Sequence, residues 1–345
     1  MSDRQSIWKC LGGMAAWAGL ALLHGWALLA LYFWFSGHHG MAAGVVLGYG
    51  AMLVLIFFMA QTKSHGAWVS LVLWLAVAVW WARRGPESGL RYPRETEQAA
   101  KLTVEGSFLT VHGIRDFRYR SATEYDARWS SRTFDLNQLE HVDFFFNYWG
   151  IPDVAHVTTS FVFKDEAPLA VSIELRAEAQ EPNTLLRGFF KQYELFYLWA
   201  DERDMIQRRT NHLQEEVYLF RSNLTPFQGR RLLLDMAQRS NALEEKPEFF
   251  NTLTDNCTNV IAQHVDEVMG RQVPWYRRPL LSGKYERLGY EQGWLLHSLP
   301  WEQHRAASLI NDRARQAGDG PEFHGRIRTH LTASGTPVQE QYPEQ

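Results

Sequence analysis

Hydrophobic positions follow two patterns in this chain: continuous runs near the N-terminus, and short alternating or helical patterns after about residue 90. Three apolar runs cover roughly 8–35, 41–60 and 67–81, with short polar segments between them. Runs of this length with almost no charge predict transmembrane helices. The third run is near the lower length limit, but its tryptophans suit an interfacial anchor. We therefore expect residues 1–84 to form an anchor of three membrane helices.

The first apolar run follows Arg4 and Lys9 and has no small-residue cleavage site, so we interpret it as a retained anchor. Basic residues flank the runs on both sides, with Arg83 and Arg84 among those after the third. Charge bias therefore leaves the orientation of the anchor open, since long domains cross membranes regardless of charge.

Beyond residue 84 the pattern changes to that of a globular domain. We expect a linker and β-rich lead-in over 85–115, with a hairpin at 102–111 around Gly106 and Ser107. An apolar run at 142–146 predicts a further strand that ends at a turn over 148–153. Only the tail after Ala333, rich in Gln, Pro and Glu, has a composition typical of disorder.

Two strictly alternating segments, 156–163 and 169–176, predict a hairpin closed by the turn at 164–168. Alternation puts His156, Thr158 and Ser160 on one face of the first strand, and Ser172 and Glu174 on one face of the second. In such a hairpin Glu174 lies opposite His156 or one diagonal step away, where a carboxylate can orient an imidazole. A slip of one residue would abolish this arrangement.

Helical signals follow the strands. Thr225 and Pro226 are typical of a helix start, and an amphipathic pattern continues over 230–242. A second amphipathic pattern over 260–268 follows the polar turn 254–259 and stops at Gly270. With Thr254 or Asp255 as its cap, this helix has Cys257 in its first turn.

Cys257 is the only cysteine outside the membrane region, where Cys10 is the other, so no disulfide framework is expected. The unpaired N–H groups and the dipole at a helix N-terminus stabilise a thiolate, which makes Cys257 the candidate nucleophile. His156 is the candidate base and Glu174 the candidate orienting residue. Each also has a structural reading, as a buried thiol, a core histidine and an ion-pair partner. Asn256 is a candidate for oxyanion support, although capping explains it more simply.

Charge and motifs exclude several classes of function. A net charge of -3 argues against a nucleic-acid-binding protein. The sequence contains no HExxH, CxxC, GxSxG or glycine-rich phosphate loop, so zinc, serine-hydrolase and nucleotide chemistry lack a basis. No cofactor or metal is required by the candidate residues.

Five motifs occur in one order that resembles the Lnb N-terminal periplasmic domain family. They are Tyr-Trp-Gly-Ile-Pro-Asp-Val-Ala-His at 148–156, Ser-Ile-Glu-Leu-Arg at 172–176, Phe-Phe-Lys-Gln-Tyr-Glu at 189–194, Ala-Asp-Glu-Arg-Asp at 200–204 and Thr-Asp-Asn-Cys-Thr at 254–258. The resemblance implies an α+β protein in which the three-helix anchor precedes a circularly permuted papain-like domain of NlpC/P60 type. We assign this domain to 116–300 and a C-terminal extension with the disordered tail to 301–345.

The resemblance also implies a bacterial inner-membrane enzyme whose large domain is periplasmic. In one branch of the family the activity is lipoprotein N-acylation, for which Cys257 matches the nucleophile, His156 the base and Glu174 the orienting residue. Membrane phospholipids would then be partners, with lipoproteins or cell-wall peptide as further ones. A cysteine amidase or peptidase and a noncatalytic binding module remain alternatives. The acyl donor and acceptor, the third catalytic residue and the oligomeric state are not fixed by the sequence.

Overall fold

The computed structural model describes residues 2–37, 39–87, 89–151, 153–270, 274, 278–279, 281–332 and 335–337. The chain forms two compact units, one of residues 1–88 with 182–193 and one of residues 89–181 with 194–345. Most of the tail predicted to be disordered, 333–334 and 338–345, lies outside the described residues.

The first unit contains the predicted anchor helices, α1 (Ser2–Trp34), α2 (His39–Met59) and α3 (Lys63–Ala82). Gly13–Trp34, Gly40–Met59 and Lys63–Ala82 are each long and apolar enough to cross a membrane, which confirms the three predicted spans. The same unit includes the short helix α4 (Leu185–Phe189) and the residues after it. Phe190 stacks on Phe33 at 5.1 Å between ring centroids, and Lys191 Nζ donates to the carbonyl of Trp81 at 2.8 Å.

The second unit combines strands with short and long helices. Its strands are β1 (Lys101–Glu105), β2 (Phe108–Arg115), β3 (Arg118–Tyr119), β4 (Tyr125–Asp126), β5 (Trp129–Asp135), β6 (Leu139–Tyr148), β7 (Ala155–Phe163), β8 (Leu169–Arg176), β9 (Glu194–Asp201) and β10 (Glu216–Arg221). Its helices are α5 (Glu202–Gln207), α6 (Pro226–Glu245), α7 (Cys257–Met269), α8 (Tyr285–Glu291), α9 (Trp301–Ala307), α10 (Asn311–Ala317) and α11 (Phe323–Arg326).

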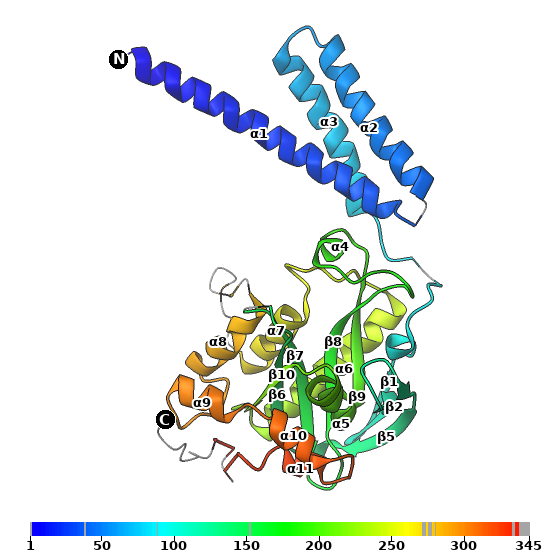
Figure 1. Cartoon of the computed structure of the whole chain (residues 1–345), viewed down its shortest axis with the longest axis vertical. Helices are drawn as coiled ribbons and strands as arrows, with labels where there is room; N and C mark the ends of the chain where they lie inside the picture. The colour runs from blue at the N-terminus through cyan, green and yellow to red at the C-terminus, as the bar shows by residue number, and fades with distance from the viewer. Residues whose placement is uncertain are drawn as a thin grey trace. The chain divides into compact units, whose positions relative to one another are not determined.

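Most of these strands form one mixed sheet in the order β1-β2-β9-β8-β7-β6-β10, with β5 paired to β2 (Figure 1). Neighbours are antiparallel except β2 and β9, which are parallel. The predicted hairpins at 102–111 and 156–176 are both present, the second with the register Thr158↔Ser172 to Phe161↔Leu169. The predicted α+β class is therefore confirmed at the level of a mixed sheet with helices.

The two faces of the sheet carry different helices, because side chains alternate along each strand. On one face Val157 and Phe146 pack with Ile261 of α7, and Trp199 Nε1 donates to Ser240 of α6. On the other face Phe145 belongs to a buried cluster with residues from β10, α5, α10, α11 and the positions next to these helices. Its other members are Ile206, Val217, Leu219, Ile310, Ala314, Ala317, Phe323 and Ile327. The site strands thus lie in the middle of a covered sheet.

A buried ionic cluster joins the C-terminal segment to this second face. Arg328 donates to Asp143 of β6 at 2.8 Å and to Glu202 of α5 at 2.8 Å, and both carboxylates are fully buried. Arg221 binds the other oxygen of Asp143, and Glu202, whose two oxygens both contact Arg328, is also bound by Ser160 and His324. Charges removed from water in this way are tolerated only because each has several partners.

Removal of the shared cation should therefore be costly. We expect Arg328→Met to lower the free energy of unfolding by about 3–5 kcal/mol, because two buried carboxylates lose their common partner. Arg326→Met is the matched control, since this arginine is 54% exposed, its ion pair is with exposed Glu322 and its bond to the carbonyl of Ala317 is long at 3.5 Å, so it should cost less than about 0.5 kcal/mol. Urea unfolding of the detergent-solubilised chain, followed by fluorescence, measures both; equal losses would contradict the assignment.

Candidate active site

Cys257 is the first residue of α7, in the first helical turn as predicted, but the cap is Asn256 rather than Thr254 or Asp255. Asn256 has extended backbone angles, and its Oδ1 accepts from the N–H of Asn259 at 2.9 Å. The two predicted caps lie before this residue; Asp255 instead exchanges backbone hydrogen bonds with Asn251 in the preceding loop. Gly270 ends the helix with φ 63°, in the left-handed conformation that glycine adopts without strain.

The side chain of Asn256 is committed to this local structure. Besides accepting from Asn259, it donates through Nδ2 to the carbonyl of Thr252 at 2.9 Å. Both ends of the amide thus hold the loop in front of α7, which is the capping role that the sequence also allowed. Backbone N–H groups at the start of α7 are the remaining donors for an oxyanion near Cys257.

His156 and Glu174 meet across the predicted hairpin. The printed register ends at Thr158↔Ser172, and two further residues along each strand bring His156 opposite Glu174. His156 Nε2 lies 3.2 Å from Glu174 Oε1 and 2.5 Å from Ser172 Oγ. Ser172 Oγ in turn donates to Glu174 Oε1 at 2.7 Å. A serine and a carboxylate therefore both orient the same ring nitrogen.

With Nε2 engaged by Ser172 and Glu174, His156 has Nδ1 left for the thiol of Cys257. The imidazole and the thiol interact, and each shifts the pKa of the other. Burial by itself lowers the pKa of His156, but the charges of Glu174 and Cys257 outweigh it and raise the pKa to about 9. The arrangement favours an imidazolium beside a thiolate.

The thiol of Cys257 shows the complementary effect. Burial disfavours the thiolate, but the interaction with His156 overcomes this and lowers the pKa below the ordinary thiol value. The hydroxyl of Thr258, 3.6 Å from Sγ, and the backbone of Val157 contribute in the same direction. Val157 is available because the β7–β8 ladder stops one residue away, at Thr158.

Arg209 adds a second layer behind the carboxylate and was not predicted from the sequence. It lies in a π-helical turn, Arg208–His212, and reaches Glu174 at 3.6 Å and Glu215 at 3.1 Å. Burial would raise the pKa of Glu174, but His156 and then Arg209 hold it well below its usual range. Glu215 also accepts from Asn147, the β6 partner of His156. This contact could not be predicted from the sequence, because Arg209 is one of several arginines in its segment and no pattern distinguishes it.

Other polar residues close in sequence to the candidate residues have partners of their own. Arg176 donates to the carbonyls of Thr96 and Glu97, and Asp153 pairs with Lys284 at 3.5 Å. His264 of α7 is buried, and Tyr197 and Asp235 bind its two ring nitrogens at 2.6 Å each.

Residues 125–283 match the family model of the Lnb N-terminal periplasmic domain, which confirms the resemblance found in the motifs. The match includes His156, Glu174 and Cys257. No curated protein and no solved structure matches the chain. Together with the three apolar helices, the family assigns the chain to the inner membrane, with its large domain in the periplasm.

The thiol–imidazole pair predicts an unusual pH profile of alkylation. In a Cys10→Ala background, Cys257 should react with iodoacetamide with a midpoint below the ordinary thiol pKa of about 8.5, because His156 favours the thiolate. His156→Ala removes that charge, so the midpoint should move to higher pH. His65→Ala, in the membrane unit, is the control and should leave the profile unchanged. Stopped alkylation followed by intact mass measures the rate; a midpoint unaffected by His156→Ala would contradict the pairing.

Proposed function

Because residues 125–283 carry the Lnb N-terminal periplasmic domain, we propose that this protein is a membrane-anchored thiol acyltransferase of permuted papain-like type. In this proposal Cys257 takes an acyl group from a membrane phospholipid and passes it to an amine. His156 acts as general base and acid, and Glu174 orients its imidazole. The supporting observation is that a thiol at a helix N-terminus interacts with a carboxylate-oriented imidazole, while the residues that follow the two in the chain line an apolar cavity.

The first half-reaction would acylate the enzyme. The thiolate of Cys257 adds to the ester carbonyl carbon, and the resulting oxyanion is held by backbone N–H groups at the start of α7. When the intermediate collapses, the C–O bond breaks. The imidazolium of His156 gives its proton to the leaving alkoxide, so that a lysophospholipid with a free hydroxyl departs.

The second half-reaction would regenerate the thiolate. A neutral amine adds to the thioester carbon and gives its proton to His156, after which the C–S bond breaks and an amide is released. Ser172 contributes here by holding Nε2 of His156, which leaves Nδ1 to exchange the proton with the sulfur and the amine. If water replaces the amine, the same steps give a fatty acid.

The apolar cavity favours an acyl group as the substrate. It measures about 40 Å³ and its lining includes Val157 and Thr258, the residues that follow His156 and Cys257 in the chain. The other lining residues are Phe144, Phe146, Ile261, Ala262, Val265, Tyr285, Gly289, Trp294 and Leu295. Such a cavity exceeds the space that one water molecule needs, yet its apolar lining offers water too few partners. The first methylene groups of an acyl chain meet that description better than a polar peptide does.

The membrane anchor supports the choice of a lipid donor. Residues 182–193 pack in the anchor unit, and Glu174 precedes Pro182 by only eight residues in the chain. Because the proposed site and the anchor belong to one chain, the enzyme stays at the membrane, which raises the effective concentration of membrane lipid.

Intact mass after incubation with phospholipid tests the proposal. The purified, membrane-reconstituted protein should gain the mass of one fatty acyl chain, and hydroxylamine should remove it, because the proposed adduct is a thioester at Cys257. Cys257→Ala should gain nothing, and His156→Ala should react about 10²–10⁴-fold more slowly. Folded protein that forms no adduct with any phospholipid would count against acyl transfer and favour the amidase or the binding module.

A variant that fills the cavity tests the role of its apolar lining. Ala262 of α7 lines the cavity, so Ala262→Leu should slow acylation by a palmitoyl ester at least tenfold more than acylation by an acetyl ester. Ala242→Leu, at an exposed position of α6, is the matched control and should leave both rates unchanged. The ratio of the two ester rates is the readout, because it cancels any general loss of active protein. An unchanged ratio would remove the cavity from the mechanism.

A further inference from the structure

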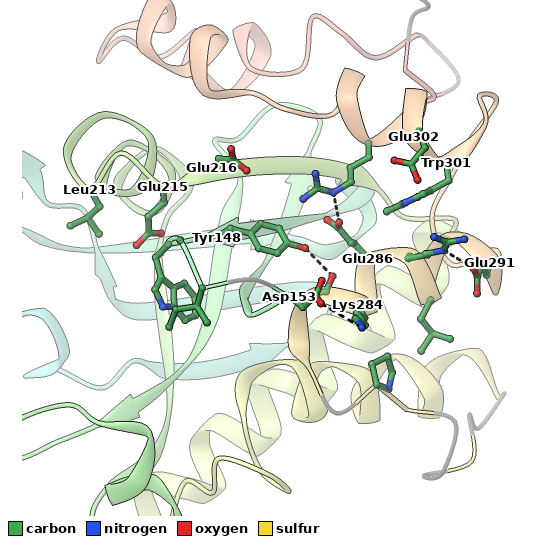
Figure 2. A pocket seen from close by; sticks show the side chains of 18 of the residues that line it. Tyr148, Asp153, Leu213, Glu215, Glu216, Lys284, Glu286, Glu291, Trp301 and Glu302 are labelled. Atoms are coloured by element: carbon green, nitrogen blue, oxygen red, sulfur yellow. Dashed lines mark hydrogen bonds and ion pairs between the residues drawn. The ribbon is translucent and has the colours of Figure 1, made fainter.

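A large acidic pocket opens at the end of the sheet from which β7 starts. It has a volume of about 1290 Å³ and is lined by the end of β6, the β6–β7 turn, the segment before β10, and helices α8 and α9. Figure 2 shows Tyr148 at its floor, with Glu286 of α8 beside it and Trp301 and Glu302 of α9 along the rim. None of the candidate catalytic side chains lines this pocket.

The charge of the pocket lining is strongly unbalanced. The lining carboxylates are Asp153, Glu215, Glu216, Glu286, Glu291 and Glu302, whereas the lining cations are Lys284, Arg287 and Arg305. The three cations pair with Asp153, Glu291 and Glu286, respectively. Arg209, which lies outside the lining, pairs with Glu215; this leaves Glu216 and Glu302 without a counter-ion among the described residues, so the pocket attracts a cation.

Glu286 is a second and independent sign of a ligand. Its side chain is only 4% exposed, and Arg305 binds Oε1, but Oε2 is buried without a hydrogen-bond partner among the described residues. A buried carboxylate oxygen that lacks a donor costs free energy, and such positions in native proteins call for an explanation. A donor supplied by a bound molecule would satisfy this oxygen.

The wall of the pocket is hydrogen-bonded to β7, the strand that carries His156, and to the turn before it. Ser282 Oγ accepts from the N–H of Ala155, the first residue of β7, and Gly283 donates to the carbonyl of Asp153. A Cβ at Gly283 would lie 2.7 Å from Tyr148 and from Asp153, so only glycine permits this close approach. The pocket wall is therefore hydrogen-bonded to the start of the strand on which His156 lies.

Glu215 links the pocket wall to the site. It lines the pocket and is bound by Asn147, the cross-strand partner of His156, and by Arg209, which also reaches Glu174. A continuous series of polar contacts thus runs from Glu215 through Arg209 and Glu174 to the imidazole of His156.

We infer that this acidic pocket binds the acyl acceptor, a peptide that presents a cationic ammonium group, while Cys257 carries the acyl chain. The inference rests on the proposed acyl transfer. The excess carboxylates attract the ammonium group, Glu286 Oε2 accepts one of its N–H groups, and Trp301 and Tyr148 provide aromatic surface for the rest of the peptide. The ammonium group then gives one proton to solvent water, and the neutral amine that results attacks the thioester carbon while His156 takes its second proton.

Peptide binding to the full chain tests the inference without any turnover. The probe is a pentapeptide of Gly and Ser with a free N-terminus and a dye at its C-terminus, added to Cys257→Ala protein in phospholipid nanodiscs. Fluorescence anisotropy should show binding that weakens with salt and is lost when the N-terminus is acetylated. Glu216→Gln with Glu302→Gln should weaken binding about two- to tenfold, because two exposed charges are removed.

Two controls separate pocket charge from folding and from general charge. Glu245→Gln with Glu322→Gln removes the same charge from exposed positions outside the pocket and should leave binding unchanged. Glu286→Gln should also weaken binding, but its ion pair with Arg305 makes it sensitive to folding, so the surface pair decides the outcome. Equal affinity for the acetylated peptide, or equal effects of the two double variants, would overturn the inference.

Thioester formation on the same variants distinguishes this inference from the proposed function. With Cys257 restored, Glu216→Gln with Glu302→Gln should form the acyl adduct at the parent rate, because the pocket serves only the second half-reaction. If the parent protein forms the adduct but binds the free and the acetylated peptide equally well, acyl transfer stands and the role of the pocket is rejected. Peptide binding in a protein that never forms the adduct would retain the pocket and reject acyl transfer.

Discussion

The register between β7 and β8 is the constraint on which the candidate site depends. Because side chains alternate, a shift of one residue would turn either His156 or Glu174 to the opposite face, where α6 and α7 pack. The apolar residues between them resist such a shift: Val157 and Ile173 are both buried under helices. The same ladder stops at Thr158, which leaves the strand start open for the sulfur at the N-terminus of α7. Core packing thus fixes the geometry that the chemistry requires.

At this site the interactions between charged groups and the effect of burial shift the pKa values in opposite directions. Desolvation disfavours the charged forms of His156, Glu174 and Cys257, yet each pKa shifts toward the charged form. The three groups achieve this only together, since the carboxylate supports the imidazolium and the imidazolium supports the thiolate. Arg209 moderates the arrangement, because it stabilises Glu174 while lowering the pKa of His156. A single group at this depth would be neutral.

Local sequence patterns predicted the strands and the helix that carry the site, because the periodicity of each element is visible within a short stretch of sequence. Alternation over 156–163 and 169–176 fixed which side chains share a face, and it led to the approach of His156 and Glu174 that the structure contains. The thiol in the first turn of α7 followed from a polar turn before an amphipathic helix. These inferences needed only periodicity and turn chemistry.

Contacts between distant segments could not be predicted in this way. Arg209 reaches Glu174 from a π-helical turn, and residues 182–193 pack with the anchor helices although they lie between two sheet strands. The predicted cap, Thr254 or Asp255, was one or two residues too early, because Thr254, Asp255 and Asn256 can all accept a backbone N–H and only the path of the preceding loop selects among them. Helices α8 to α11 are short, and their sequences carry weak periodicity.

Two cavities of opposite character, one apolar and one acidic, fit the two substrates of the proposed reaction. The apolar cavity has no partner for a charged group, since most of its lining side chains, from α7 and the elements around it, are apolar. The acidic pocket favours an ammonium group. An acyl chain and a cationic acceptor would therefore not compete for the same space, and each would be poorly held in the wrong cavity. A hydrolase needs only the first of these cavities, because water requires no dedicated pocket. The acidic pocket is the feature that would make transfer to an amine, rather than release of a fatty acid, the favoured second step.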